Sequence, residues 1–222
     1  WVSRTPSART TGLVATGLAF YAWAGIVPVL VLLGMTVLTF AATRVIPRRL
    51  GLGLALLLLN LVPLVLYKYY DPLMRGLGLG SGAAPSLGWA LPLGLSFFTF
   101  NLIGHGLDVY WGLGKPADSL GQLIAYASFF PTVSSGPLMR FEDFRGQLQA
   151  GGRASWADVD AGVFRIALGL AKKVLIADGL GAVVDPLFAD AGSLRLGGAW
   201  VAVLGEHFRI YLDFSGYTDI AI

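Results

Sequence analysis

The residues best suited to chemistry gather near the end of the chain, in the segment 206–219. Four ionisable or phenolic residues follow one another there at intervals of three, four and four, which places them on one face of a helix: Glu206, Arg209, Asp213 and Tyr217. Arg209 and Asp213 have the spacing of an ion pair across one turn. The stripe is either a polar face buried for a function or the solvated end of a helix, and spacing alone favours neither.

Two histidines are the other candidates for acid–base chemistry. A neutral imidazole at His105 or His207 could act as a general base, a proton relay or a metal ligand. We interpret His105 instead as a hydrogen-bonded packing residue, and we treat His207 with the same caution. The chain has no cysteine, no HExxH motif and no G-x-S-x-G motif, so the sequence predicts neither a metal site nor a nucleophile elbow.

The composition indicates the environment in which the fold must position these residues. Hydrophobic residues make up 55% of the 222 residues and charged residues 13%, whereas soluble domains carry about 25% charged residues. The net charge of +3 comes from scattered basic residues rather than from a basic face, which argues against nucleic-acid binding. We therefore expect an all-α polytopic membrane protein with the lipid bilayer as its surroundings. Because the chain runs from Trp1 to an apolar end at Ile222, we expect a piece of a longer protein.

Four membrane spans are expected in the first half, near residues 11–24, 28–43, 50–67 and 89–107. The first two divide one uncharged run, which as a single helix would reach ~51 Å, against a bilayer core ~30 Å thick. Basic residues flank this run on both sides, so the positive-inside rule predicts a hairpin with both flanks in the cytoplasm. Segment 76–88, which is rich in Gly, Ser, Ala and Pro, is expected to be an extracytoplasmic loop.

The segment 119–139 has the length of a span but is predicted to be broken, because Pro131 and Pro137 interrupt it and Ser134, Ser135 and Gly136 lie between them. Broken backbone at membrane depth must be buried in protein or line a wet cavity, since lipid offers it no hydrogen bonds. The polar stretch that follows, 140–160, is expected to be an aqueous loop.

Beyond that stretch, residues 161–177 form an expected amphipathic helix, with Arg165 and Lys172 seven apart on one face. Such a helix lies at the membrane interface or turns a cationic stripe toward a cavity. Residues 179–195 are expected to form a loop, and 197–214 a further span.

Several stretches, in order along nearly the whole chain, resemble one family: membrane-bound O-acyltransferases (MBOAT), in the alginate O-acetyltransferase-like branch. Each motif is modest by itself, and it is their order that makes the resemblance specific. The matching stretches are FYAW at 20–23, YKY at 67–69, LPLGLSFFTF at 91–100 with DVY at 108–110, SFFP at 128–131 with GPLMR at 136–140, GLAKKVLIAD at 169–178, and YLDFSGYTDIAI at 211–222.

The resemblance implies part of a bowl of tilted helices around a tunnel, in the inner membrane of a bacterium. It implies transfer of an acyl group, here acetyl, to hydroxyls of an exported polysaccharide such as alginate, with accessory acetylation proteins as partners. It implies no bound cofactor, and the acyl donor stays unidentified. In the family the catalytic base is a histidine downstream of the DFSGY motif. We therefore assign no catalytic residue here, expect the base beyond Ile222, and expect residues 1–222 alone to be inactive.

The resemblance also implies roles for ten residues. In the broken segment, four residues would shape the tunnel wall: Pro131, Gly136, Pro137 and Arg140. In the last motif, four residues would orient helices near the reaction centre: Asp213, Ser215, Tyr217 and Asp219. Lys172 and Lys173, with Arg140, could attract an anionic acyl-thioester donor. Ordinary positive-inside anchoring and hydrogen bonding between membrane helices are the alternatives.

Two other classes of function stay open at this point. Broken helices and buried charges are also features of secondary transporters, although the sequence contains no internal repeat. A purely structural membrane subunit is the third possibility.

Overall fold

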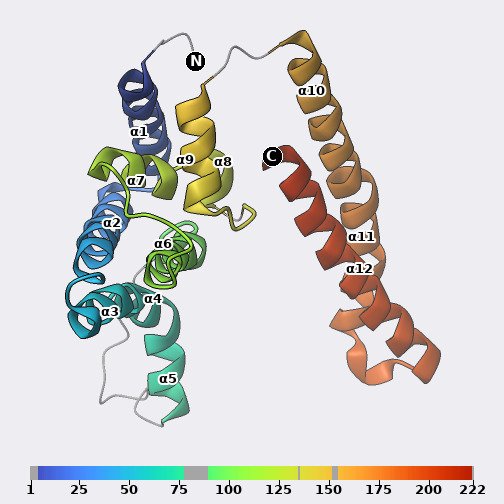
Figure 1. Cartoon of the computed structure of the whole chain (residues 1–222). Helices are drawn as coiled ribbons and strands as arrows, with labels where there is room; N and C mark the ends of the chain where they lie inside the picture. The colour runs from blue at the N-terminus through green and yellow to red at the C-terminus, as the bar shows by residue number, and fades with distance from the viewer. Residues whose placement is uncertain (1–4, 78–89, 135, 152–154, 222) are drawn as a thin grey trace. The chain divides into compact units, whose positions relative to one another are not determined.

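The computed structural model describes residues 5–77, 90–134, 136–151 and 155–221, and all regular structure within these ranges is helical (Figure 1). The chain divides into two compact units, which we call unit 1 (Trp1–Gly152) and unit 2 (Arg153–Ile222).

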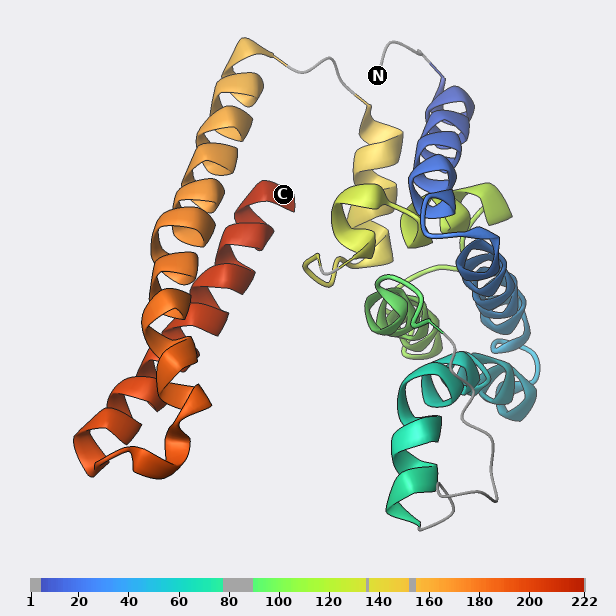
Figure 2. The same ribbon diagram turned by 180° about the vertical axis from the view of Figure 1, so that it is seen from behind.

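Unit 1 begins with two helices joined by a tight turn, α1 (Pro6–Ala22) and α2 (Ile26–Val45). Gly25 between them has a φ of +111°, which a residue with a side chain rarely adopts. The expected hairpin is wrong, because α2 runs on from the end of α1 and does not fold back beside it (Figures 1 and 2). Another helix, α7 (Leu120–Ala127), packs against both α1 and α2.

The third apolar run is helical over Leu50–Gly76, well past the expected end at residue 67. It consists of α3 (Leu50–Leu58), α4 (Leu61–Leu64), the π-helical segment η1 (Val65–Tyr69) and α5 (Tyr70–Gly76). Pro72 does not end the run, and it lies three residues after the π-helical segment η1. Most of the expected loop 76–88 lies outside the described residues.

Helix α6 (Leu95–Tyr110) begins later than the expected span, which started at residue 89. Pro92 and Gly94 delay it: Gly94 has a φ of +67°, and its backbone lies directly against the carbonyl of Val133. From this start α6 sends Phe98 and Leu102 into the core of unit 1, where the Phe98 ring meets Tyr21 edge to face.

The segment 119–139 is broken as predicted. It contains α7, the single turn α8 (Phe130–Val133) and a non-helical stretch that leads to α9 (Phe141–Ala150). Pro131 stands in the first turn of α8, where proline fits a helix. The expected aqueous loop 140–160 is wrong, because α9 occupies half of it. Its apolar residues Phe141, Phe144 and Leu148 follow helical spacing and are buried, although the stretch is polar on average.

Unit 2 is a pair of long antiparallel helical runs (Figures 1 and 2). The first run comprises α10 (Trp156–Leu170), the π-helical segment η2 (Ala171–Ala177) and α11 (Asp178–Ala189). After a short 3₁₀ turn, η3 (Ala191–Ser193), α12 (Leu196–Ala221) runs back beside it. The expected loop 179–195 is wrong, because α11 fills most of it: packing against α12 overrides the glycines and Pro186.

Within the described ranges, two helical segments are long and apolar enough to cross a bilayer: Ile26–Val45 and Leu50–Gly76. The other expected spans differ in length or charge. Helices α1 and α6 have 17 and 16 residues, and α12 has 26 but carries the ionisable stripe. The expected fold class, an all-α membrane protein, is confirmed.

Candidate functional site

In unit 2 the two helical runs touch through glycine. A Cβ added to Gly169 of α10 would lie 2.5 Å from the carbonyl oxygen of Gly216 in α12, and one added to Gly216 would lie 2.7 Å from the carbonyl oxygen of Gly169. Since no side chain fits between them, the two backbones approach as closely as small residues allow. This contact sets the distance across which the neighbouring polar side chains must reach.

Lys172 lies next to this glycine contact and pairs with the last motif. Its Nζ donates to Oδ2 of Asp219 at 2.6 Å and to Oγ of Ser215 at 3.1 Å. Both charged side chains are about one quarter exposed, at 26% and 24%. Three of the ten residues predicted to matter therefore meet in one cluster.

Lys173 forms a second cluster with two carboxylates. Its Nζ lies 2.7 Å from Oδ1 of Asp178 and 2.8 Å from Oδ1 of Asp213. The predicted partner of Asp213 was Arg209, so the pairing inferred from helical spacing is not the one formed. Arg209 instead binds Asp185 of α11 and Glu206 of its own helix.

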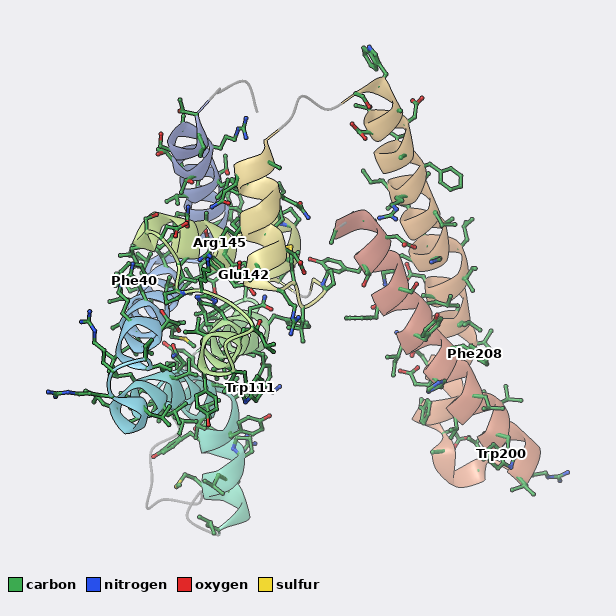
Figure 3. All side chains as sticks on the ribbon, in the orientation of Figure 1. Phe40, Trp111, Glu142, Arg145, Trp200 and Phe208 are labelled. Carbon is green, nitrogen blue, oxygen red and sulfur yellow. The ribbon has the colours of Figure 1, made fainter. Side chains whose placement is uncertain are left out.

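The ionisable stripe of α12 is thus turned toward the first helical run of unit 2 over much of its length. We call the three groups around Lys172, Lys173 and Arg209 the ion-pair seam. Tyr217, the remaining stripe residue, is half-buried in α12. Bulky apolar residues of α12 such as Trp200 and Phe208 (labelled in Figure 3) are more than half exposed within the unit.

Unit 1 contains a cavity of ≈ 200 Å³ beside α6. Residues of α6 and its end form one side, residues 138–141 form another, and Tyr126 of α7 contributes as well. The lining residues are Phe100, Asn101, Gly104, His105, Leu107, Asp108, Trp111, Tyr126, Leu138, Met139, Arg140 and Phe141. Trp111 is labelled in Figure 3 near the end of α6.

His105 is the most unusual residue of this cavity. Its side chain is buried, with 2% exposure, and its ring lies 4.2 Å from the ring of Phe141. Neither ring nitrogen has a hydrogen-bond partner among the described residues. The interpretation of His105 as a hydrogen-bonded packing residue is therefore wrong: it packs, but its polar atoms are not paired.

An ion pair lies at the edge of the cavity. Arg140 donates from Nη2 to Oδ1 of Asp108 at 3.3 Å, and the Arg140 side chain is 63% exposed while that of Asp108 is 14% exposed. The Tyr126 hydroxyl donates to the carbonyl oxygen of Met139 and so holds segment 138–141 against α7. Arg140 thus presents positive charge beside an otherwise mostly apolar cavity.

The other predicted residues of the broken segment act on the backbone and do not line this cavity. Gly136 is buried, and a Cβ there would lie 2.3 Å from Cα of Thr132, so the chain can turn back tightly after α8. Pro131 opens α8, and Pro137 follows the turn. Together they direct the chain so that residues 138–141 reach α6.

Arg145 is a structural residue that the sequence reasoning missed. It is buried in α9, donates to the carbonyl oxygens of Lys115 and Pro116, and lies beside Glu142 (Figure 3). The available signal was the spacing of three between Glu142 and Arg145. Across the described ranges, no group of three or more His, Asp or Glu side chains is close enough to hold a metal ion.

These features define a helical membrane protein with a small mixed cavity in one unit and an ion-pair seam in the other. No family model matches the chain, but curated relatives do. The chain is 32% identical to "Probable alginate O-acetylase AlgI" of Pseudomonas aeruginosa, over 96% of this chain and 43% of that protein. It is 30% identical to the peptidoglycan O-acetyltransferase of Helicobacter pylori, over 95% of this chain and 46% of that protein.

A teichoic acid D-alanyltransferase of Bacillus subtilis is 27% identical over 59% of this chain and 33% of its own length. The chain belongs to the membrane-bound O-acyltransferase family, as the ordered motifs indicated. It spans less than half the length of these relatives.

Proposed function

We propose that the protein to which this chain belongs is an O-acyltransferase that transfers an acetyl group to hydroxyls of an exported polysaccharide. The observation that carries this proposal is the 32% identity to an alginate O-acetylase along 96% of the chain. The peptidoglycan O-acetyltransferase of Helicobacter pylori is similar over nearly the same length, so the acceptor is a glycan in both cases. Transporter and structural roles have no comparable support.

The proposal includes a multi-pass location in the bacterial inner membrane. Two apolar helical segments, Ile26–Val45 and Leu50–Gly76, are separated by a short turn that contains Arg48 and Arg49. Basic residues between two spans favour the cytoplasmic side. The acetyl donor would then arrive from the cytoplasm as a co-substrate, the polysaccharide from outside, and accessory acetylation proteins would complete the system.

The ion-pair seam of unit 2 would serve this function by fixing the helices that carry the last motif. Lys172 pairs with Asp219 and Ser215, and Lys173 pairs with Asp213. We propose that these residues orient helices and do not touch substrate. Attraction of the donor by the two lysines stays a prediction. Each lysine is already paired with at least one carboxylate, so the donor would have to share its positive charge.

The test is genetic and chemical. Deleting the gene in its own bacterium should remove ester-linked acetate from one exported polysaccharide, measured after mild alkaline release, and the intact gene should restore it. If acetate on exported polysaccharides and on peptidoglycan is unchanged by the deletion, the proposal is wrong. Measuring ester-linked D-alanine in the same samples would reveal the reaction named for the Bacillus relative.

A substitution within the seam refines this test. Asp213→Leu in the complementing gene should lower the acetate content, because Lys173 loses one of its two carboxylates. Asp160→Leu, at an exposed position on α10, is the matched control and should restore the content as the intact gene does. Membrane levels of both proteins must be equal for the comparison to count.

A further inference from the structure

The loop that joins α6 to α7 is held to two other helices through its backbone. Arg145 of α9 donates from Nη2 to the carbonyl oxygens of Lys115 and Pro116, at 3.1 and 2.6 Å. Arg44, in the last turn of α2, donates from Nη2 to the carbonyl oxygen of Ala117 at 2.9 Å. Because these bonds come from outside the loop, they fix the direction in which its side chains point.

The side chains presented at this place are aromatic, aliphatic and basic. Trp111 (labelled in Figure 3) and Leu113 are 61% and 62% exposed, and Tyr110 beside them is 41% exposed. Lys115 is exposed in the loop, and the exposed side chain of Arg140 lies beside the end of α6, which it contacts. We call these five residues the α6-end patch.

The two carboxylates in contact with the patch already have cationic partners. Asp108, which is 14% exposed, pairs with Arg140. Glu142 pairs with Arg145 and accepts a hydrogen bond from the backbone N–H of Lys115. The Lys115 ammonium forms no ion pair within the part of the chain that the structure describes. A guanidinium has five N–H donors, so the bond to Asp108 leaves others of Arg140 for an anion.

Exposed Trp and Tyr side chains next to Lys and Arg are typical of the boundary between a bilayer and water, where aromatic rings lie among the lipid head groups. The side of the membrane follows from Arg44, which ties the loop to the end of α2, just before the turn with Arg48 and Arg49. In the proposed function that turn is cytoplasmic, and the cytoplasmic leaflet carries anionic lipids. The charge of the patch is therefore complementary to that leaflet.

We propose that the α6-end patch binds the head group of an anionic phospholipid in the cytoplasmic leaflet. Lys115 and Arg140 bind the phosphate, while Trp111 and Leu113 lie among the neighbouring head groups. The inference rests on the proposed membrane location for the side on which the lipid lies, and it assigns no chemical step to the lipid. Because Arg44 and other side chains hold the loop before a lipid arrives, little conformational freedom is lost on binding, which favours affinity.

Photolabelling of the intact purified protein in detergent tests the proposal without any turnover. The probes are phosphatidylglycerol, which is anionic, and phosphatidylcholine, which has no net charge, each with a photoreactive diazirine close to the head group. Peptide mass spectrometry measures labelling of residues 107–116 and 138–142 against lipid concentration, which gives an apparent affinity. We expect phosphatidylglycerol to bind at least about 5-fold more tightly, and an equal concentration of inorganic phosphate not to displace it. Equal affinity for the two lipids, or displacement by phosphate, would overturn the proposal.

Variants identify the two cations as the binding groups. Lys115→Gln should weaken phosphatidylglycerol binding about 5-fold, and Lys115→Gln combined with Arg140→Gln about 10–30-fold, with phosphatidylcholine binding unchanged. Lys68→Gln combined with Arg75→Gln is the matched control, because it removes one lysine and one arginine from exposed positions toward the other end of Leu50–Gly76. Affinity at the patch should stay within about 2-fold in this control. An equal loss in both double variants would mean that only the total charge matters, and the proposal would be wrong.

The single variant of Lys115 keeps the proposal falsifiable if the double variant fails to fold. Arg140→Gln leaves Asp108 without its partner, whereas Lys115→Gln breaks no ion pair of the described residues. Lys115→Arg keeps the charge and should bind phosphatidylglycerol as the unmodified protein does. Trp111→Ser should weaken both lipids alike, because it removes apolar contact and no charge. Unchanged affinity in Lys115→Gln, or no labelling because another protein segment covers the patch, would refute the lipid site.

The two proposals fail in different ways. Labelling by phosphatidylglycerol that depends on Lys115, together with a gene deletion that leaves acetate unchanged, would refute only the proposed acetyl transfer. Loss of acetate on deletion, with no preference for phosphatidylglycerol at the patch, would refute only the lipid site.

Discussion

Units 1 and 2 are stabilised by opposite means. Unit 1 buries large side chains, with Tyr21, Phe98 and Phe141 at its centre. In the described part of unit 2 the buried positions are small: Gly169, Ala177, Gly181, Val184, Ala202 and Gly216. Three ion pairs join its two helical runs, and bulky apolar side chains such as those of Phe164 and Leu175 are exposed. Unit 1 is organised like a protein core, and unit 2 like a helix pair for an apolar environment.

The comparison teaches where substitutions are most damaging. A packed core tolerates little change in volume, because its side chains interdigitate. A helix pair in contact through glycine tolerates little change at the contact but much more on its outer faces. The four experiments that follow use thermal unfolding in detergent unless another measurement is stated, and the first two compare matched positions.

The largest effect is expected at the start of α6 in unit 1. Gly94→Ala should cost ~3 kcal/mol or more, because the new Cβ would strike the Val133 carbonyl in addition to the strain of a positive φ. Gly112→Ala is the control: its φ is +73°, but a Cβ there meets no atom within 4 Å. It should cost ~1–2 kcal/mol from backbone strain alone. Equal losses in the two variants would show that the close contact is not important.

The next effect tests the glycine contact of unit 2. Gly169→Ala should destabilise the hairpin by ~1–3 kcal/mol, since the methyl group would push against Gly216 of α12. Gly162→Ala lies on the same helix with nothing within 4 Å, and it should stabilise the protein by ~0.5–1 kcal/mol through helix propensity. A stabilising effect from both substitutions would mean that α10 and α12 are not in contact.

A smaller effect is expected from one ion pair of the seam. In a double-mutant cycle on Lys172→Met and Asp219→Asn, we expect a coupling free energy of ~0.5–1 kcal/mol, because both side chains are partly exposed. The coupling should shrink in high salt. If the two single effects simply add, the contact between these residues contributes nothing to stability.

The smallest effect concerns the beginning of α10. Hydrogen bonds from the backbone and side chain of Ser155 hold the pKa of Asp158 below its ordinary value. A lowered carboxyl pKa contributes stability above the ordinary pKa and loses it as pH falls through the lowered value. Hydrogen exchange of the first amides of α10 should therefore show less protection in strong acid. Asp158→Asn should remove this pH dependence, and its persistence in that variant would exclude the cap as its source.

The sequence predicted the helical class, the position of most helices and the break at Pro131, because apolar runs and proline are local signals. It missed α9 and α11, whose stability depends on partners that are distant in sequence. Phe141 and Phe144 of α9 pack against Tyr126, and α11 packs against α12. In the prediction from sequence, the glycine, proline and charged residues of those two segments outweighed the helical spacing of their apolar residues.

The candidate residues show the same limit. Helical spacing placed Asp213 on the correct face but gave it the wrong partner, because the lysines that meet α12 come from another helix. His105 could be recognised as a residue type suited to chemistry, but its burial beside a cavity depends on how segment 138–141 folds onto α6. No pattern within α6 itself carries that information.

The π-helical segment η2 makes the number of residues in this region as informative as their identity. A π turn closes over five residues where an α turn closes over four, so η2 accommodates a residue that a plain α-helix would not need. Removing one residue from Ala171–Ala177 could restore a regular α-helix and leave the residues after it close to their present orientation, because the extra residue is absorbed within the π turns. Removing one residue from the regular α-helix between Asp178 and Asp185 would instead rotate Asp185 by about 100°, away from Arg209. A homologous chain that is one residue shorter within Ala171–Ala177 could therefore keep the same ion pairs, whereas one that is shorter within α11 could not.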